Sequence, residues 1–217
     1  RMRADMNVFQ MNSPLMRGIR KILELMYIGM LWFICSIPLV TLGAATAALY
    51  EVLLKAVKNQ EGYLFKSFLR AFQNNFKQGT CIWLPIALAE VLFSVNLFYY
   101  GVLGGGNFVL QTVVFSVLLV LVTALSSYVF PIIAKFENTA MGHVRMAATL
   151  ALRNPGWTAA LVVIQILTLF AVWFFIYFPL LFIMGFSGYV QAVIFNHIFD
   201  RLIENGMIIE ENGQRNT

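Results

Sequence analysis

The chain has 217 residues, of which 60% are hydrophobic and 12% are charged, and its formal net charge is +5. Soluble domains carry about twice this share of charged residues, so the composition excludes an ordinary soluble protein and indicates a membrane protein. The positive charge could suggest nucleic-acid binding, but the basic cytoplasmic loops of a membrane protein produce the same excess. We therefore expect a lipid bilayer, and no nucleic acid, as a partner.

The first apolar segment spans residues 22–58 and contains Pro38 and Gly43 near its middle. Proline removes a backbone donor and clashes with the preceding helical turn, so a helix should break there. Lysine and arginine stand on both sides of the segment, and the positive-inside rule places both flanks in the cytoplasm. We therefore expect a helical hairpin that enters and leaves the membrane on one side, with neighbouring protein satisfying the backbone groups at the bend. The alternative is one kinked span with the basic N-terminal segment outside.

A second pattern runs from residue 61 to residue 77. Apolar side chains recur there at spacings of three and four, with cations between them: Phe65, Phe68, Leu69, Phe72 and Phe76, and the basic Lys66, Arg70 and Lys77. This spacing predicts an amphipathic helix in the membrane interface, with its basic face toward lipid phosphates. A cytoplasmic helix packed on the bundle would have the same pattern, and both interpretations stay open.

Four later segments are long and apolar enough to cross a bilayer: 79–101, 109–134, 157–178 and 188–203. A cytoplasmic helix over 137–153 should connect the second and third of them. The loops 101–107 and 178–188 contain no Lys or Arg and should lie outside, which places both ends of the chain in the cytoplasm. The sequence thus predicts an all-α fold, a single polytopic transmembrane helical bundle over 1–217 built from the hairpin, four spans and cytoplasmic interfacial helices.

Glu90 is the one acid within the predicted span 79–101. A charged side chain near the bilayer centre costs a few kcal/mol, so such residues usually face the bundle interior. Ser94 lies one turn further along the same face, and Gln165 is a polar residue in another span. We consider these three a candidate intramembrane polar site. It is either a proton- or cation-linked transport site, or a glutamic acid hydrogen-bonded to Ser or Gln on a neighbouring helix.

His197, Asp200 and Arg201 fall within one turn near the end of the last predicted helix and could form a helix-end network that anchors the topology. A His beside an acid is also a minimal metal or proton-relay motif, but a stable metal site needs more ligands, and His143 lies in another segment. The sequence contains no phosphate-binding loop and no nucleophile paired with a base. We therefore expect no enzyme activity, no cofactor and no metal.

Four stretches of the sequence resemble a known family. They are "NSPLMRGIRKILELMYIGMLWFICSIPLVTLGAATAALYEVLLK", "EGYLFKSFLRAFQNNFKQGT", "YVFPIIAKFENTAMGHVRMAATLALRNPGW" and "YFPLLFIMGFSGYVQAVIFNHIF". Together they resemble the YesL-like family of small bacterial integral membrane proteins, a domain of unknown function often encoded beside carbohydrate ABC transporter components and sensor kinases. The resemblance implies the bacterial cytoplasmic (inner) membrane. It defines no catalytic or ligand residues.

Three functions are compatible with these observations. The first, which we favour, is a non-enzymatic accessory protein that binds an ABC permease, a sensor kinase or a second copy of itself, using the small-residue face Gly43 to Leu49 and apolar grooves. The second is a small-solute or ion transporter centred on Glu90. The third is a membrane enzyme acting on a lipid-linked substrate. Sparse polar chemistry and short loops favour the first.

Overall fold

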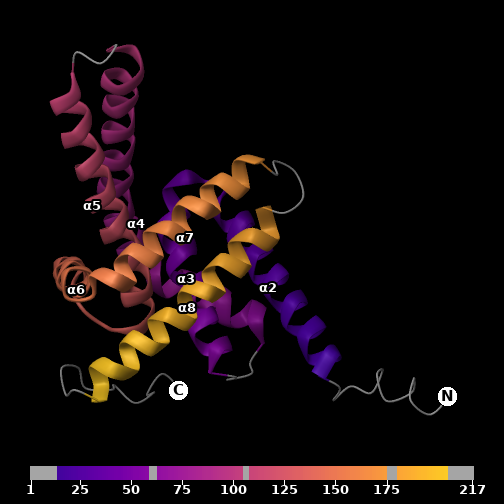
Figure 1. Ribbon diagram of the computed structural model, residues 1–217. Helices are drawn as coiled ribbons and strands as arrows, with labels where there is room; N and C mark the ends of the chain where they lie inside the picture. Colours follow the sequence, from indigo (N-terminus) through magenta and orange to yellow (C-terminus); the bar gives the residue numbers. More distant parts are fainter. Residues whose placement is uncertain (1–13, 59–62, 105–107, 175–179, 205–217) are drawn as a thin grey trace.

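The computed structural model describes residues 14–58, 63–104, 108–174 and 180–204. Every regular element in this part of the chain is a helix, which confirms the all-α class. The elements are α2 (Pro14–Ser36), the 3-10 helix η1 (Leu39–Thr41), α3 (Leu42–Val57), α4 (Leu64–Phe98), the π-helical turn η2 (Tyr99–Leu103), α5 (Val109–Lys135), α6 (Ala140–Arg153), α7 (Pro155–Phe174) and α8 (Leu180–Glu204) (Figure 1).

Helices α2 and α3 form an antiparallel pair, broken between Ser36 and Leu42 where Pro38 stands. Near the open end, Lys21 Nζ donates to the carbonyl of Ala56 at 2.7 Å. Near the bend, Trp32 Nε1 donates to Thr46 Oγ1 at 3.1 Å. The pairing fits a hairpin rather than one kinked helix.

Backbone carbonyls at the bend accept hydrogen bonds from side chains, in addition to the backbone N–H groups of Thr41 and Leu42 that pair with Pro38 and Leu39. Thr41 Oγ1 donates to the carbonyl oxygens of Cys35 at 2.5 Å and Pro38 at 2.7 Å. Trp83 Nε1, from α4, donates to the carbonyl of Leu39 at 2.9 Å. Unpaired carbonyls in an apolar environment are unfavourable by several kcal/mol, so these bonds make a bend within the protein tolerable.

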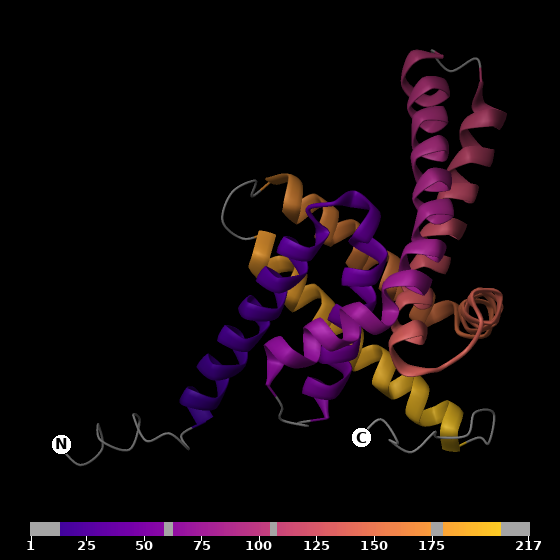
Figure 2. The same cartoon turned by 180° about the vertical axis from the view of Figure 1, so that it is seen from behind.

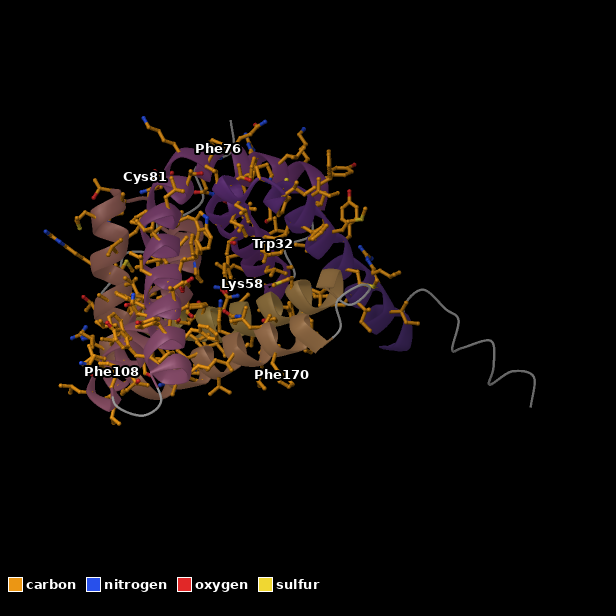
Figure 3. All side chains as sticks on the ribbon, turned by 90° about the horizontal axis from the view of Figure 1, so that it is seen from above. Trp32, Lys58, Phe76, Cys81, Phe108 and Phe170 are labelled. Atoms are coloured by element: carbon orange, nitrogen blue, oxygen red, sulfur yellow. The ribbon has the colours of Figure 1, made fainter. Side chains whose placement is uncertain are left out.

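Helix α4 differs from the sequence prediction. The predicted interfacial helix 61–77 and span 79–101 are one continuous helix, Leu64–Phe98, and residues 61 and 62 lie outside the described part. Figures 2 and 3 show its first part lying across one end of the molecule and its later part running beside α5, with the change of direction between Phe76 and Cys81. The prediction of two helices was wrong because Gly79, between those residues, packs against α3 within an unbroken helix.

The boundary between α6 and α7 follows from Pro155. Proline disfavours helical backbone in the residue before it, and it fits the first position of a helix, where no N–H is needed. The two helices break at Asn154 and meet at 107°. At its start, α6 is capped by Thr139, whose Oγ1 accepts from the backbone N–H of Gly142 at 3.2 Å. Helix α6 is thus a separate helix at the position of the predicted connector.

The last two predicted spans have different bounds in the structure. Helix α7 is described to Phe174, so the end of the predicted span 157–178 lies outside the described residues. Helix α8 begins at Leu180, eight positions before the predicted start of the span 188–203. The prediction of an outer loop at 178–188 was wrong for residues 180–188, because this uncharged apolar run continues α8.

Almost all charged side chains of the described chain lie at one end of the molecule. The starts of α2 and α4, the ends of α3, α5 and α8, and the whole of α6 lie at this end, which we call the basic end (Figure 1). Every described Asp, Glu, Lys and Arg except Glu90 lies in one of these helix parts or directly beside one, as Lys58 does after α3 and Glu137 does between α5 and α6.

Three described helices are long and apolar enough to cross a membrane: Leu39–Val57, Leu64–Val102 and Val109–Lys135. The bent pair Ala140–Arg153 and Pro155–Phe170 reaches that standard only when taken together. These helices indicate a membrane protein. The spans predicted at 157–178 and 188–203, and the side of the membrane on which each terminus lies, stay predictions.

Candidate functional site

Glu90 lies at the base of a projecting limb. We use this name for Leu84–Phe98 of α4 and Val109–Thr123 of α5, which rise together away from the other helices (Figure 1). Around the base of the limb, α4 buries Ile82 and Ile86, and α5 is buried on all sides from Ser126 to Ile133. Farther along the limb, both helices expose apolar side chains. Glu90 thus stands where α4 and α5 leave the core.

The carboxylate of Glu90 has one described side-chain partner. Ser126 Oγ on α5 donates to Glu90 Oε1 at 3.3 Å and also lies 2.9 Å from the carbonyl oxygen of Thr123. Ser126 is buried, whereas Glu90 is half-buried. The geometry is a glutamic acid hydrogen-bonded to a serine on the neighbouring helix, one of the two arrangements considered from the sequence.

The other two members of the candidate site do not join Glu90. Ser94 is exposed one turn further along α4. Gln165 is half-buried on α7, a helix that packs on α5, α6 and α8. The expected constellation of Glu90, Ser94 and Gln165 is therefore not assembled in the described structure.

A buried polar chain lies elsewhere, among α3, α7 and α8, and sequence analysis missed it. Tyr50 donates its hydroxyl to Gln191 Oε1 at 2.6 Å, and Gln191 Nε2 donates to Ser187 Oγ at 3.2 Å. Ser187 Oγ lies 2.7 Å from Thr168 Oγ1 on α7. Tyr50, Ser187 and Gln191 are all buried. Because each group has a partner within the protein, this chain acts first as an internal connection between the three helices.

The same seam continues toward the basic end. Asn196 Nδ2 donates to the carbonyl of Leu54 at 3.2 Å, and Lys58 Nζ pairs with Asp200 Oδ1 at 2.9 Å. Residue numbers rise together on α3 and α8, so the two helices are parallel. The spacing of four between Tyr50, Leu54 and Lys58, and between Ser187 and Gln191, is the signal in the sequence that could have revealed the seam.

The predicted helix-end network separates in the structure. His197 is exposed and packs its ring edge-on to Trp157, with the centroids 5.9 Å apart. Asp200 pairs with Lys58, the residue directly after α3. No hydrogen bond or ion pair joins His197, Asp200 and Arg201 to one another among the described residues. Asp200 therefore ties α8 to α3 rather than to its own helix.

The small-residue face does not lie on the surface. Gly43, Ala44, Ala45, Ala47, Ala48 and Leu49 are all buried. A Cβ built on Gly79 would stand 2.9 Å from the Cα of Ala44, so α3 and α4 touch backbone to backbone here. The expectation that this face binds a partner was wrong, because α4 of the same chain already occupies it.

The basic face of α4 has the exposure that the sequence predicted. Lys66, Arg70 and Lys77 are exposed, whereas Phe68, Ala71 and Asn75 are buried. The predicted apolar face of this helix is only partly buried. Phe68 lies in the core, whereas Phe65 and Phe76 remain exposed beside the cations.

His143 of α6 is a titratable side chain buried at the basic end. Its imidazole is fully buried, and burial lowers its pKa below the ordinary value, opposed by a smaller contribution from the backbone of Asn138. Asn138 also accepts a hydrogen bond at its carbonyl from Gln78 Nε2 of α4, at 2.7 Å. The start of α6 is thus held against α4.

The fold and these contacts define an all-α protein of the integral membrane class. Residues 25–97 match a family described as "Protein of unknown function, DUF624". The match covers less than half of the chain: about half of α2, all of α3, and α4 as far as Leu97, which includes Glu90. No curated protein and no solved structure matches the chain. The similarity to the YesL-like family stays a resemblance.

Proposed function

We propose that this chain is a non-enzymatic accessory protein of the bacterial cytoplasmic membrane that binds the transmembrane helices of another membrane protein through its projecting limb. The resemblance described above suggests an ABC permease or a sensor kinase of a carbohydrate system as that partner. Charge at the basic end supports a cytoplasmic location for that end and for both termini.

The observation that carries the proposal is the surroundings of Glu90. Its side chain is half-exposed at the base of an apolar limb, and its described hydrogen bond engages one carboxylate oxygen. Ser94 is exposed one turn away. Lipid tails offer neither group a hydrogen bond, and a charged or polar group facing lipid is unfavourable by a few kcal/mol. A donor from a partner helix would remove that penalty.

The rest of the limb is also suited to bind a transmembrane helix of another protein. Exposed apolar side chains line both helices: Leu84, Leu88, Val91, Leu92, Val95 and Phe98 on α4, and Val109, Leu110, Val113, Val114, Val117, Val120 and Leu121 on α5. A limb of two helices buries little of this surface within the chain. Helix association in membranes uses van der Waals packing with a few interhelical hydrogen bonds, and the limb supplies both.

Site-specific photo-crosslinking in native membranes tests the proposal. A photoreactive residue at Val91, which is 60% exposed on the limb, should form an adduct with another membrane protein. The matched control is Ile166 on α7, which is 56% exposed and should give no such adduct. The substitution Glu90→Leu should reduce the Val91 adduct. Adducts with lipid alone, with a second copy alone, or equally at Ile166 would each overturn the proposal.

A flux measurement distinguishes the transporter alternative from the accessory-protein proposal. If Glu90 carries ion coupling, purified protein in liposomes loaded with a pH-sensitive dye should show a proton flux that Glu90→Gln abolishes. We expect no flux above that of empty liposomes for either chain. For the alternative of an enzyme acting on a lipid-linked substrate, the sequence offers no nucleophile paired with a base from which to propose a reaction.

A further inference from the structure

The first part of α4, Leu64–Gly79, is divided into three sectors around its axis. At 100° per residue, the buried side chains Phe68, Ala71, Asn75 and Gly79 fall within about 80° of arc. Lys66, Arg70 and Lys77 fall within about 40° on the opposite side. Phe65 and Phe76 lie about 20° apart between these two sectors, and both are exposed. The buried sector fixes which way the other two face.

The buried sector packs against α3 and is hydrogen-bonded to it. Phe68 and Ala71 are part of the main core. Asn75 Nδ2 donates to Glu51 Oε2 of α3 at 3.1 Å and to the carbonyl of Ala71 at 2.9 Å. Gly79 lies against Ala44. This part of α4 is therefore held in one orientation and not free to rotate.

The basic sector is uncompensated within the described chain. None of Lys66, Arg70 and Lys77 makes an ion pair with a described residue. Helix α4 contains no acid before Glu90. By contrast, Lys55 pairs with Glu51 at 2.9 Å, and Lys58 pairs with Asp200 at 2.9 Å. Neighbouring cations thus have partners in the protein, and these three face outward for a partner of opposite charge.

The aromatic flank indicates what kind of anion this is. Phe65 is 51% exposed and Phe76 is 42% exposed, and Tyr63, directly before α4, is 86% exposed. Aromatic side chains next to cations are typical of helices lying at the boundary between headgroups and acyl chains. The helix lies across the basic end and continues directly into the limb (Figures 2 and 3), so its outer face stands where a membrane-crossing helix leaves the bilayer.

We propose that Lys66, Arg70 and Lys77, together with the flank of Phe65 and Phe76, bind the headgroups of anionic phospholipids at the membrane surface. An acidic soluble protein could match the cations, but water would then surround the exposed phenylalanines, so the lipid surface fits both sectors. The cations contact lipid phosphates, and the phenylalanine rings insert among the first carbons of the acyl chains. This inference is independent of the partner proposed for the limb.

A lipid-retention experiment tests it. The full chain is reconstituted in equimolar phosphatidylcholine and phosphatidylglycerol, extracted in mild detergent, and its retained lipid is quantified by mass spectrometry. Phosphatidylglycerol should be enriched over phosphatidylcholine. Each cation removed should lower this enrichment by up to about fivefold, corresponding to about 1 kcal/mol per cation near an anionic surface. High salt should lower it as well.

Four variants distinguish the effect of the basic and aromatic sectors of α4 from an effect of the total positive charge of the protein. K66Q/R70Q should lose the enrichment, whereas R145Q/R201Q, which removes two exposed cations from α6 and α8, should keep it. K66R/R70K should also keep it, which shows that a folded helix with its charge intact suffices. F65S/F76S should lower retention of both lipids. Equal enrichment in K66Q/R70Q and R145Q/R201Q, or no enrichment in the unaltered chain, would overturn the proposal.

Discussion

Gly43 and Gly79 stand face to face where α3 crosses α4. A Cβ on Gly43 would collide with the carbonyl oxygen of Gly79 and with Trp83 Cβ, and a Cβ on Gly79 would stand 2.9 Å from both the backbone nitrogen and the Cα of Ala44. Both glycines are buried. The contact places α4 close enough for Trp83 to reach the carbonyl of Leu39 at the hairpin bend. The close packing of α3 on α4 is therefore linked to the hydrogen bond that Trp83 donates at the hairpin bend.

Alanine at either glycine should destabilise the protein. Gly79→Ala forces a methyl group against α3 backbone, which cannot move without shifting the helix, and we expect a loss of about 1–3 kcal/mol in the free energy of unfolding. Gly156→Ala is the matched control, because a Cβ there meets nothing within 4 Å. Unfolding in detergent by denaturant or heat measures both. Equal stability of the two variants would contradict the backbone contact.

Trp83→Phe should weaken the hairpin bend. The ring is kept approximately in size, but the N–H that donates to the carbonyl of Leu39 at 2.9 Å is lost, and that carbonyl keeps only the backbone N–H of Leu42 as a donor. A loss of about 0.5–1.5 kcal/mol in the free energy of unfolding is expected, because one of the two hydrogen bonds is removed. Trp157→Phe at the start of α7 provides the control and should have a smaller effect. Faster hydrogen exchange at residues 39–42 in Trp83→Phe, and not in the control, would locate the change at the bend.

Local features of the sequence predicted much of the fold. Pro38 breaks the first apolar segment in any environment, so the helix boundary near it follows from backbone chemistry alone. The amphipathic spacing around Lys66 and Arg70 likewise predicted which side of that helix is exposed. The sequence did not predict that the helix continues through Gly79, because glycine is compatible with both a loop and a tightly packed helix. Only the neighbouring α3 decides between them.

Interactions distant in the chain could not be predicted in the same way. Tyr50 and Gln191 are separated by 141 positions, and nothing local pairs them. The small residues from Gly43 to Leu49 indicate that some helix packs closely there, but not whether it belongs to this chain or to a partner. For Glu90, the sequence was compatible with a transport site and with a hydrogen-bonded acid, and only the packing of α4 on α5 identifies Ser126 as its partner.

The buried bond between Tyr50 and Gln191 should contribute measurably to stability. Tyr50→Phe removes the donor, Gln191→Leu removes the acceptor, and the double variant removes both. The coupling free energy from this cycle should be about 0.6–1.7 kcal/mol, the range typical of hydrogen bonds between membrane helices. Thr149→Val, which removes a hydroxyl that bonds only the carbonyl of Arg145 within α6, serves as a control partner and should show no coupling to Tyr50→Phe. Strict additivity of Tyr50→Phe and Gln191→Leu would show that the bond does not form in solution.

His143 should make the protein sensitive to acid. Burial lowers its pKa in the folded state below the ordinary value of about 6.5 that it has when unfolded, so between those two values the unfolded chain binds more protons. The stability is therefore fully present above about pH 6.5 and is lost as the pH falls through the lower folded pKa. Thermal unfolding in detergent at pH 7.5 and 5.5 should show a larger decrease of Tm for the unaltered chain than for His143→Gln, which does not titrate. His197→Gln, at an exposed position, should keep the full decrease. If His143→Gln keeps it too, the acid sensitivity arises elsewhere and the buried imidazole does not control it.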